Sequence, residues 1–210
     1  MINPLILAID QFRPEEKAMS MATQVLETGG ILVAPTETRY GLMTRIDNID
    51  TVERLFALKK REKYLPTAIF VRSHDEIEDF GFGNPISRKL AKRFLPGPMT
   101  LILRTKKLYP PPIVVDGKIG IRYSSAAIVK GLLKRVSSNL TATSANLSGK
   151  ESPKTISEIA SLFKTEVALY LDAGPLAAAP STVVDCSADG FVIRRHGAIS
   201  EEEIKENLDG

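Results

Sequence analysis

The chain has few of the residues that build disulfides and zinc sites. Cys186 is its only cysteine, and His74 and His196 are its only histidines. One cysteine cannot form an internal disulfide, and these three side chains are too few for a zinc cluster. We therefore expect no metal site built from the protein. Cys186 and His74 are assigned structural roles, and the role of His196 stays open.

Long apolar runs and a strong charge of either sign are also missing. No apolar run approaches the roughly 18 residues that a membrane span requires, and the amino terminus lacks the basic segment of a secretory signal. Because 43% of the residues are apolar and the mean hydropathy is near zero, a disordered chain is excluded. We expect a cytoplasmic protein without membrane association. Its net charge of +3 suits anionic ligands such as a nucleotide, but is small for a dedicated nucleic-acid-binding protein.

Two common phosphate-binding sequences are absent as well. A P-loop would need Ser or Thr after a Gly-Lys pair, but Gly117-Lys118 is followed by Ile119, and Gly149-Lys150 by Glu151. No Gly-x-Gly-x-x-Gly sequence occurs either. A nucleotide would therefore have to be held by basic side chains, hydroxyls and backbone N–H groups.

Strand and helix patterns alternate along the whole chain. The strands are predicted at residues 2–9, 31–34, 42–46, 68–71, 99–103, 119–122, 140–143, 167–171, 182–185 and 191–194. The helices are predicted at 14–28, 50–58, 75–80, 84–95, 126–135, 156–163 and from 200 onward. Pro14, Asp50, Asn84 and the pair Ser200 and Glu203 mark predicted helix starts. Because no repeat or linker interrupts this pattern, we predict a single α/β domain over residues 1–210.

Several loops have the polar groups that a nucleotide site needs. The turn at 35–42 places two hydroxyls, a carboxylate, a guanidinium and a phenol after a strand. The basic run at 59–63 suits a polyphosphate, although a solvated helix end would look the same. Residues 141–149 concentrate hydroxyls and small residues where N–H groups bind anions, although a capped turn is the simpler explanation. Arg122 suits a two-bond contact with a carboxylate, or a surface ion pair.

Taken together, these segments resemble the YrdC family over residues 30–199. Seven motifs match in family order, and their order makes a chance match hard to obtain. They are Pro35-Thr36-Glu37-Thr38-x-Tyr40-Gly41-Leu42, Lys59-x-Arg61, Pro96-Gly97-Pro98-x-Thr100, Gly120-x-Arg122, Ser144-Ala145-Asn146-x-Ser148-Gly149, Pro180-Ser181-Thr182-Val183-x-Asp185 and Arg195-x-Gly197.

The resemblance implies a twisted mixed β-sheet with flanking helices around a deep basic cavity. It also implies a reaction in which the carbamate of L-threonine, formed with bicarbonate, attacks the α-phosphate of ATP and pyrophosphate leaves. The product, threonylcarbamoyl-adenylate, would pass to a tRNA threonylcarbamoyl transferase. Such a reaction requires positioning and charge stabilisation rather than a protein nucleophile, and Mg²⁺ carried by ATP would share the phosphate charge. We expect a synthase of the short, single-domain type.

The resemblance also implies roles for individual residues. Those expected to contact threonine are Thr38, Arg122, Ala142 and Ser181. Those expected to contact ATP are Lys59, Arg61, Lys118, Ser144, Asn146, Ser152 and Arg195. Lys59, Arg61 and Arg122 would be the catalytic groups. Because residues two apart on a helix point to different faces, Lys59 and Arg61 can share a ligand only if the chain leaves the helix at Lys60. Lys60 and Lys63 would then be solvated.

Four departures from the family pattern leave alternatives open. They are Arg39 in place of an apolar or aromatic residue, Met43 in place of glycine, Glu62-Lys63-Tyr64-Leu65 in place of a proline-containing run, and Tyr123-Ser124 in place of x-Pro. One alternative is a paralogue with another nucleotide-dependent substrate. Another is a module that binds tRNA or double-stranded RNA without catalysis.

Overall fold

The computed structural model describes residues 3–62 and 64–209 and has the predicted mixed α/β fold. One twisted sheet runs through this part of the chain in the strand order β1-β10-β2-β3-β9-β4-β8-β6-β11-β12, with β5 beside β6 and β7 beside β8. The strands are β1 (Ile6–Ala8), β2 (Leu32–Pro35), β3 (Tyr40–Met43), β4 (Ala68–Phe70), β5 (Gly81–Phe82), β6 (Met99–Thr105), β7 (Val114–Val115), β8 (Lys118–Arg122), β9 (Leu140–Ser144), β10 (Leu169–Asp172), β11 (Thr182–Asp185) and β12 (Val192–Arg195).

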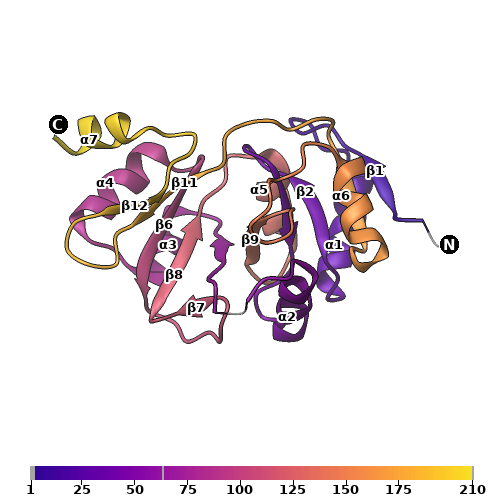
Figure 1. Cartoon of the computed structure of the whole chain (residues 1–210), viewed down its shortest axis with the longest axis horizontal. Helices are drawn as coiled ribbons and strands as arrows, with labels where there is room; N and C mark the ends of the chain where they lie inside the picture. The colour runs from indigo at the N-terminus through magenta and orange to yellow at the C-terminus, as the bar shows by residue number, and fades with distance from the viewer. Residues whose placement is uncertain (1–2, 63, 210) are drawn as a thin grey trace.

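Helices pack against this sheet. They are α1 (Glu16–Glu27), α2 (Ile49–Leu58), α3 (His74–Phe80), α4 (Pro85–Phe94), α5 (Ala127–Arg135), α6 (Ile156–Phe163), the short 3-10 helix η1 (Lys164–Glu166) and α7 (Glu201–Asp209). The amino-terminal strand β1 and the carboxy-terminal helix α7 lie at opposite ends of the long axis (Figure 1). The segment from β10 to β11 runs across the top of that view and joins the two halves.

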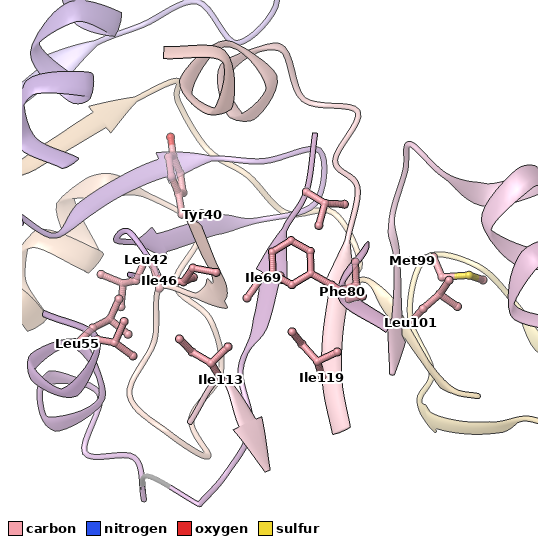
Figure 2. Close-up of a cluster of buried hydrophobic side chains, with 14 of the residues drawn as sticks. Tyr40, Leu42, Ile46, Leu55, Ile69, Phe80, Met99, Leu101, Ile113 and Ile119 are labelled. Atoms are coloured by element: carbon pink, nitrogen blue, oxygen red, sulfur yellow. The ribbon is translucent and has the colours of Figure 1, made fainter. Parts of the chain in front are cut away.

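The core lies on both faces of the sheet because successive side chains of a strand point to opposite faces. In β2, Leu32 and Ala34 pack in the cluster under α1 and α5, whereas Val33 packs in the larger cluster with α6. Figure 2 shows part of the larger cluster, in which Leu42 and Leu55 lie near Ile113. Strands buried on both faces read as continuous apolar runs, and residues 31–34 are such a run.

Two predicted helix starts are wrong by two residues. Helix α1 begins at Glu16 rather than Pro14, and α2 begins at Ile49 with Asn48 as its cap, not Asp50. The Asn48 side chain accepts a hydrogen bond from Thr51 N at 3.1 Å, which leaves Asp50 in the first helical turn.

The predicted strand at 42–46 is corrected to Tyr40–Met43, since pairing with β2 already begins at Pro35 opposite Tyr40. Further along, Arg45 forms only an isolated bridge to Leu140. The caps at Asn84 and at Ser200 with Glu203 are confirmed.

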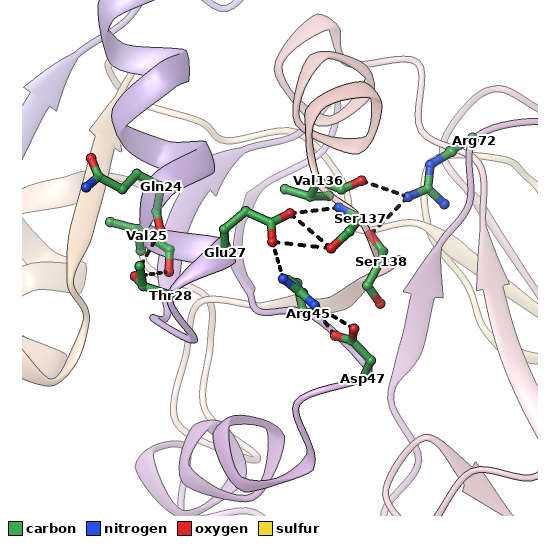
Figure 3. Close-up of polar contacts among 10 residues, drawn as sticks. All are labelled: Gln24, Val25, Glu27, Thr28, Arg45, Asp47, Arg72, Val136, Ser137 and Ser138. Atoms are coloured by element: carbon green, nitrogen blue, oxygen red, sulfur yellow. Dashed lines mark hydrogen bonds and ion pairs between the residues drawn. The ribbon is translucent and has the colours of Figure 1, made fainter.

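A polar network fixes the connection from α5 to β9 (Figure 3). Arg72 donates from Nε to Leu133 O at 2.9 Å and from Nη2 to Val136 O and Ser138 O, so carbonyls at and after the end of α5 have partners. Glu27 accepts from Ser137 N at 2.7 Å and also pairs with Arg45. These contacts set the chain entering β9, which lines the site described next.

Candidate functional site

A cavity of about 700 Å³ lies where several strand ends meet. Its wall combines the turn between β2 and β3, strands β4, β8 and β9, the loop after β9, and strands β11 and β12. Seven basic and three acidic side chains line it, so the cavity is basic, as the family resemblance implied. Such a site favours anionic ligands.

The structure brings nearly all the predicted site residues to this one cavity. Those that line it are Thr38, Arg61, Lys118, Arg122, Ala142, Ser144, Asn146, Ser152, Ser181 and Arg195. They come from segments between 38 and 195 of the chain, so their convergence is a property of the fold. Their individual contacts with threonine or ATP stay predictions.

Lys59 is the predicted residue that does not line the cavity. Helix α2 ends at Leu58, and the chain leaves the helix as the argument for Lys59 and Arg61 requires, with Lys60 at a φ of 51°. Lys59 is 1% exposed, and its Nζ donates to the backbone oxygens of Ser144 and Asn146. It therefore supports the loop after β9 from behind. Burial and the nearby charge of Arg61 lower the pKa of Lys59 to about 7.

Arg61 reaches the cavity from the other side of this turn. Its guanidinium lies 5.5 Å from the ring centre of Phe56 and donates from Nη2 to Pro66 O at 2.7 Å. Its Nε is buried without a hydrogen-bond partner among the described residues, and burial lowers its pKa. Lys60 is exposed, as predicted, whereas Lys63 lies outside the described residues.

The loop after β9 is held by its own asparagine. Asn146 donates from Nδ2 to Leu147 O at 2.8 Å and to Lys150 O at 2.7 Å, while its Oδ1 accepts from Ser144 Oγ. Ser144 and Asn146 line the cavity, and Ser152 follows in the same segment. Asn146 therefore shapes the loop that was predicted to hold phosphate.

Arg122 and Arg195 both line the cavity, and Ser181 holds Arg195 in place. Arg195 donates from Nε and Nη2 to Ser181 O, at 3.1 and 3.0 Å, and a Cβ on Gly197 would lie 2.2 Å from Pro180 O. Only glycine allows this close approach, which explains the Arg-x-Gly motif. Partial enclosure and the charges of Arg122, Arg39 and Arg61 lower the pKa of Arg195. Several guanidinium groups thus face one space.

Lys118 has a partner that the sequence did not indicate. Its Nζ lies 3.3 Å from Asp185 Oδ2, which also accepts from Arg194 Nη2 at 2.8 Å. Burial alone would raise the pKa of Asp185, but hydrogen bonds from Ser187, Arg194 and Lys118 hold it well below its usual range. Asp185 is therefore an anion that orders two cations on the cavity wall.

The departures from the family pattern fall into two groups. Arg39 and Tyr64 line the cavity, and Arg39 also donates from Nε to Ala178 O at 3.0 Å. Met43 is buried in the core, and Ser124 lies behind the wall, where it donates to Glu37. Neither Glu37 nor Ser124 was assigned a role from sequence, because the contact of Glu37 with Arg122 spans 85 residues and that of Ser124 with Glu37 spans 87.

The residues assigned structural roles do not line the cavity. Cys186 follows β11, and burial raises the pKa of its thiol to about 12. His74 starts α3, is exposed, and makes an edge-to-face contact with Tyr123. His196 is exposed and follows β12.

The described residues offer neither a metal-binding cluster nor a membrane-spanning helix. They contain no group of three or more histidine, cysteine, aspartate or glutamate side chains that could hold a metal ion. Among the helices described, none is long and apolar enough to cross a membrane.

Most of the chain matches proteins of one known family. Residues 24–197 match the Sua5/YciO/YrdC family model, described as "Telomere recombination". The threonylcarbamoyl-AMP synthase of Bacillus subtilis is 32% identical over 200 residues, covering 93% of this chain but 58% of that protein. A Methanocaldococcus jannaschii protein is 34% identical and matched over 96% of its own length.

Two solved structures extend the comparison. Pyrococcus abyssi Sua5 complexed with L-threonine superposes with a TM-score of 0.90 at 29% identity, over 97% of this chain and 61% of that chain. E. coli YciO superposes with a TM-score of 0.88 at 25% identity, over 96% of this chain and 99% of that one. This chain thus spans about three fifths of the length of the B. subtilis and P. abyssi proteins.

Proposed function

The chain belongs to the Sua5/YciO/YrdC family, and we propose that it is a threonylcarbamoyl-AMP synthase acting on L-threonine, bicarbonate and ATP. One observation carries the proposal. The residues expected to contact threonine and all but one of those expected to contact ATP converge on a single basic cavity. A relative with the same fold was crystallised with L-threonine, which supports threonine as the amino acid.

In the proposed reaction, the threonine amine and bicarbonate condense to a carbamate with loss of water. A carbamate oxygen then bonds to the α-phosphorus of ATP, the bond between the α- and β-phosphates breaks, and pyrophosphate leaves. Arg61, Arg195 and Lys118 would stabilise the phosphate charge, and Arg122 would hold the threonine carboxylate or its carbamate. Positioning and charge suffice, so no protein nucleophile is needed.

Magnesium would enter with the nucleotide. Of the three acidic residues on the cavity wall, Asp185 is already hydrogen-bonded to cations, and Asp116 and Glu151 form no metal-binding group with other described residues. The ion would therefore be held by ATP phosphates and would share their charge. The adenylate would pass to a tRNA threonylcarbamoyl transferase in the cytoplasm, where ATP and tRNA are found.

The test is an assay of purified protein with ATP, Mg²⁺, bicarbonate and each amino acid in turn. We expect pyrophosphate release and the adenylate, identified by mass spectrometry, to require threonine and bicarbonate together. Serine lacks one methyl group, which is worth only about 1–3 kcal/mol, so it should react weakly. Equal release with serine, or release without bicarbonate, would contradict the proposal.

A second candidate is a paralogue that acts on a different substrate of the same cavity. It is favoured by Arg39 and Tyr64, which line the cavity where the family pattern has other residues, and by the likeness to YciO over nearly its whole length. Pyrophosphate release with another carboxylate, and none with threonine, would support it. Salt-sensitive binding of tRNA without any release would instead support the RNA-binding module.

A further inference from the structure

Arg122 is held by protein partners before any ligand binds. Its Nη2 donates to Glu37 Oε1 at 2.8 Å and to Thr38 Oγ1 at 2.7 Å. Its Nε is buried and has no partner among the described residues. The side chain is nine-tenths buried, with the guanidinium 5.4 Å from the centre of the Phe70 ring. Within the described part of the chain, Nε is therefore without a partner, whereas Nη2 already has two.

The shape of a guanidinium limits how Arg122 can bind a carboxylate. A carboxylate binds with both oxygens along an edge formed by two guanidinium nitrogens. Because Cδ blocks the edge between Nε and Nη1, both remaining edges include Nη2. Both hydrogens of Nη2 in Arg122 are committed to Glu37 and Thr38. A two-bond contact with a substrate carboxylate therefore requires one of these two partners to give way.

Glu37 is the partner that is anchored. Its second oxygen, Oε2, accepts from Ser124 Oγ. Ser124 Oγ in turn accepts from Ala126 N at 3.2 Å, which directs its own hydrogen toward Glu37. Ser124 is 1% exposed, and neither it nor Glu37 lines the cavity. Glu37 is thus fixed through both oxygens behind the cavity wall.

Thr38 is the partner that faces the ligand space. Its hydroxyl lies 3.0 Å from Thr36 Oγ1, which donates its only hydrogen to Arg39 O at 2.7 Å. Thr38 must therefore donate to Thr36 and accept from Arg122. Thr38 lines the cavity, so an incoming carboxylate can take its place on Nη2.

We propose that Glu37 and Ser124 are the positioning residues of Arg122. Ser124 fixes Glu37, Glu37 fixes Nη2, and the substrate carboxylate then binds at Nη2 and a neighbouring guanidinium nitrogen in place of Thr38. The substrate part of this inference rests on the proposed function. The positioning part concerns the ligand-free protein and stands apart from it.

The experiment compares Ser124→Ala, Glu37→Gln and a matched control, Ser87→Ala. Ser87 is equally buried, but it caps α4 and does not line this cavity. Two readouts are used, namely the kinetics of threonine-dependent pyrophosphate release and the hydrogen-exchange rate of the Arg122 Nε–H, followed by NMR in the ligand-free protein. The NMR signal is assigned by its loss in Arg122→Lys.

We expect Ser124→Ala to raise the KM for threonine about three- to tenfold, as the loss of one hydrogen bond would, with the kcat and the KM for ATP within about twofold. Glu37→Gln should raise the KM for threonine further, because a neutral amide cannot accept hydrogen bonds from both Arg122 and Ser124 as a carboxylate does. Arg122 Nε–H should exchange faster in both variants and at the wild-type rate in Ser87→Ala. Ser124→Thr, which keeps the hydroxyl, should restore both readouts.

Two results would overturn the proposal. One is an unchanged Arg122 exchange rate in both Ser124→Ala and Glu37→Gln. The other is an equal rise in threonine KM in Ser87→Ala, which would make the effect a general loss of stability. If the wild-type protein releases no pyrophosphate with threonine, the proposed function fails, and the exchange rates alone decide whether Glu37 and Ser124 position Arg122.

Discussion

Lys59 and Asn146, 87 positions apart, meet directly: Lys59 Nζ donates to the backbone oxygen of Asn146 at 2.8 Å and approaches its side-chain oxygen at 3.4 Å. The contact joins the end of α2 to the loop after β9. Ser148 N also donates to Lys59 O at 2.9 Å, so the two segments are joined in both directions. The buried Lys59 amino group thus sets the shape of the segment that carries Ser144 and Asn146 to the cavity.

Replacing Lys59 with methionine should therefore weaken both the fold and the ATP site. The oxygens of Ser144 and Asn146 would lose a buried donor, which costs about 1–3 kcal/mol for an unsatisfied group. Urea denaturation should show this loss, and ATP titration should show weaker binding. Lys60→Met is the matched control, because exposed Lys60 should change stability by less than about 0.5 kcal/mol. Equal effects in the two variants would contradict the buried role of Lys59.

The lowered pKa of Lys59 predicts a pH dependence of stability. Its pKa is about 7 in the folded protein and 10.5 as an ordinary lysine, so between these values the unfolded chain holds a proton that the folded chain lacks. The free energy of unfolding should therefore rise with pH across this window, by at most about 1.4 kcal/mol per pH unit. Denaturation of wild type and Lys59→Met at pH 7, 8 and 9 tests this. The same pH dependence in both proteins would show that Lys59 does not titrate there.

Much of the fold was predictable because its strands and helices follow simple periodic patterns. The run at 140–143 and the cap at Asn84 were correctly placed for this reason. The start of α2 was not, since Asn48 and Asp50 are both good caps two residues apart. Tertiary contacts decide between them: Thr51 and Arg54 both donate to Gly29 O, which fixes the first turn of the helix.

The site was predictable as a set of residues but not as a set of contacts. The family resemblance placed Arg122 and Lys118 in it, and both line the cavity. Their partners Glu37 and Asp185 come from distant segments, and a sequence pattern does not show which side chains meet across a sheet. Lys59 looks solvated in a basic run, and its burial depends on where α2 ends relative to the loop after β9.

Charge reversal in the basic turn separates a cavity contact from a surface charge. Arg61→Glu should weaken ATP binding at least about tenfold, even at about 0.3 M salt, because a partly enclosed charge is screened less than an exposed one. Lys60→Glu, next to it but exposed, should have a small effect that salt removes. ATP titrations at low and high salt measure both. Equal, salt-sensitive losses would mark the turn as a general basic surface and favour the RNA-binding alternative.

Arg122→Ala should impair threonine use far more than ATP binding. The substitution removes the free buried Nε donor and leaves Glu37 as a buried carboxylate without its cation. Loss of a buried charged hydrogen bond of this kind costs about 2–5 kcal/mol, well within the range of a threonine titration. Lysine keeps the charge but not the flat two-bond geometry, so Arg122→Lys should recover only part of the loss. Threonine KM and ATP affinity, measured on the wild type, Arg122→Ala and Arg122→Lys, test the assignment.

A double variant separates loss of stability from loss of substrate binding. Because Glu37 is left unpaired in Arg122→Ala, the double variant Glu37→Gln/Arg122→Ala should regain stability but not threonine use. If threonine use returned with stability, Arg122 would serve the fold rather than the substrate.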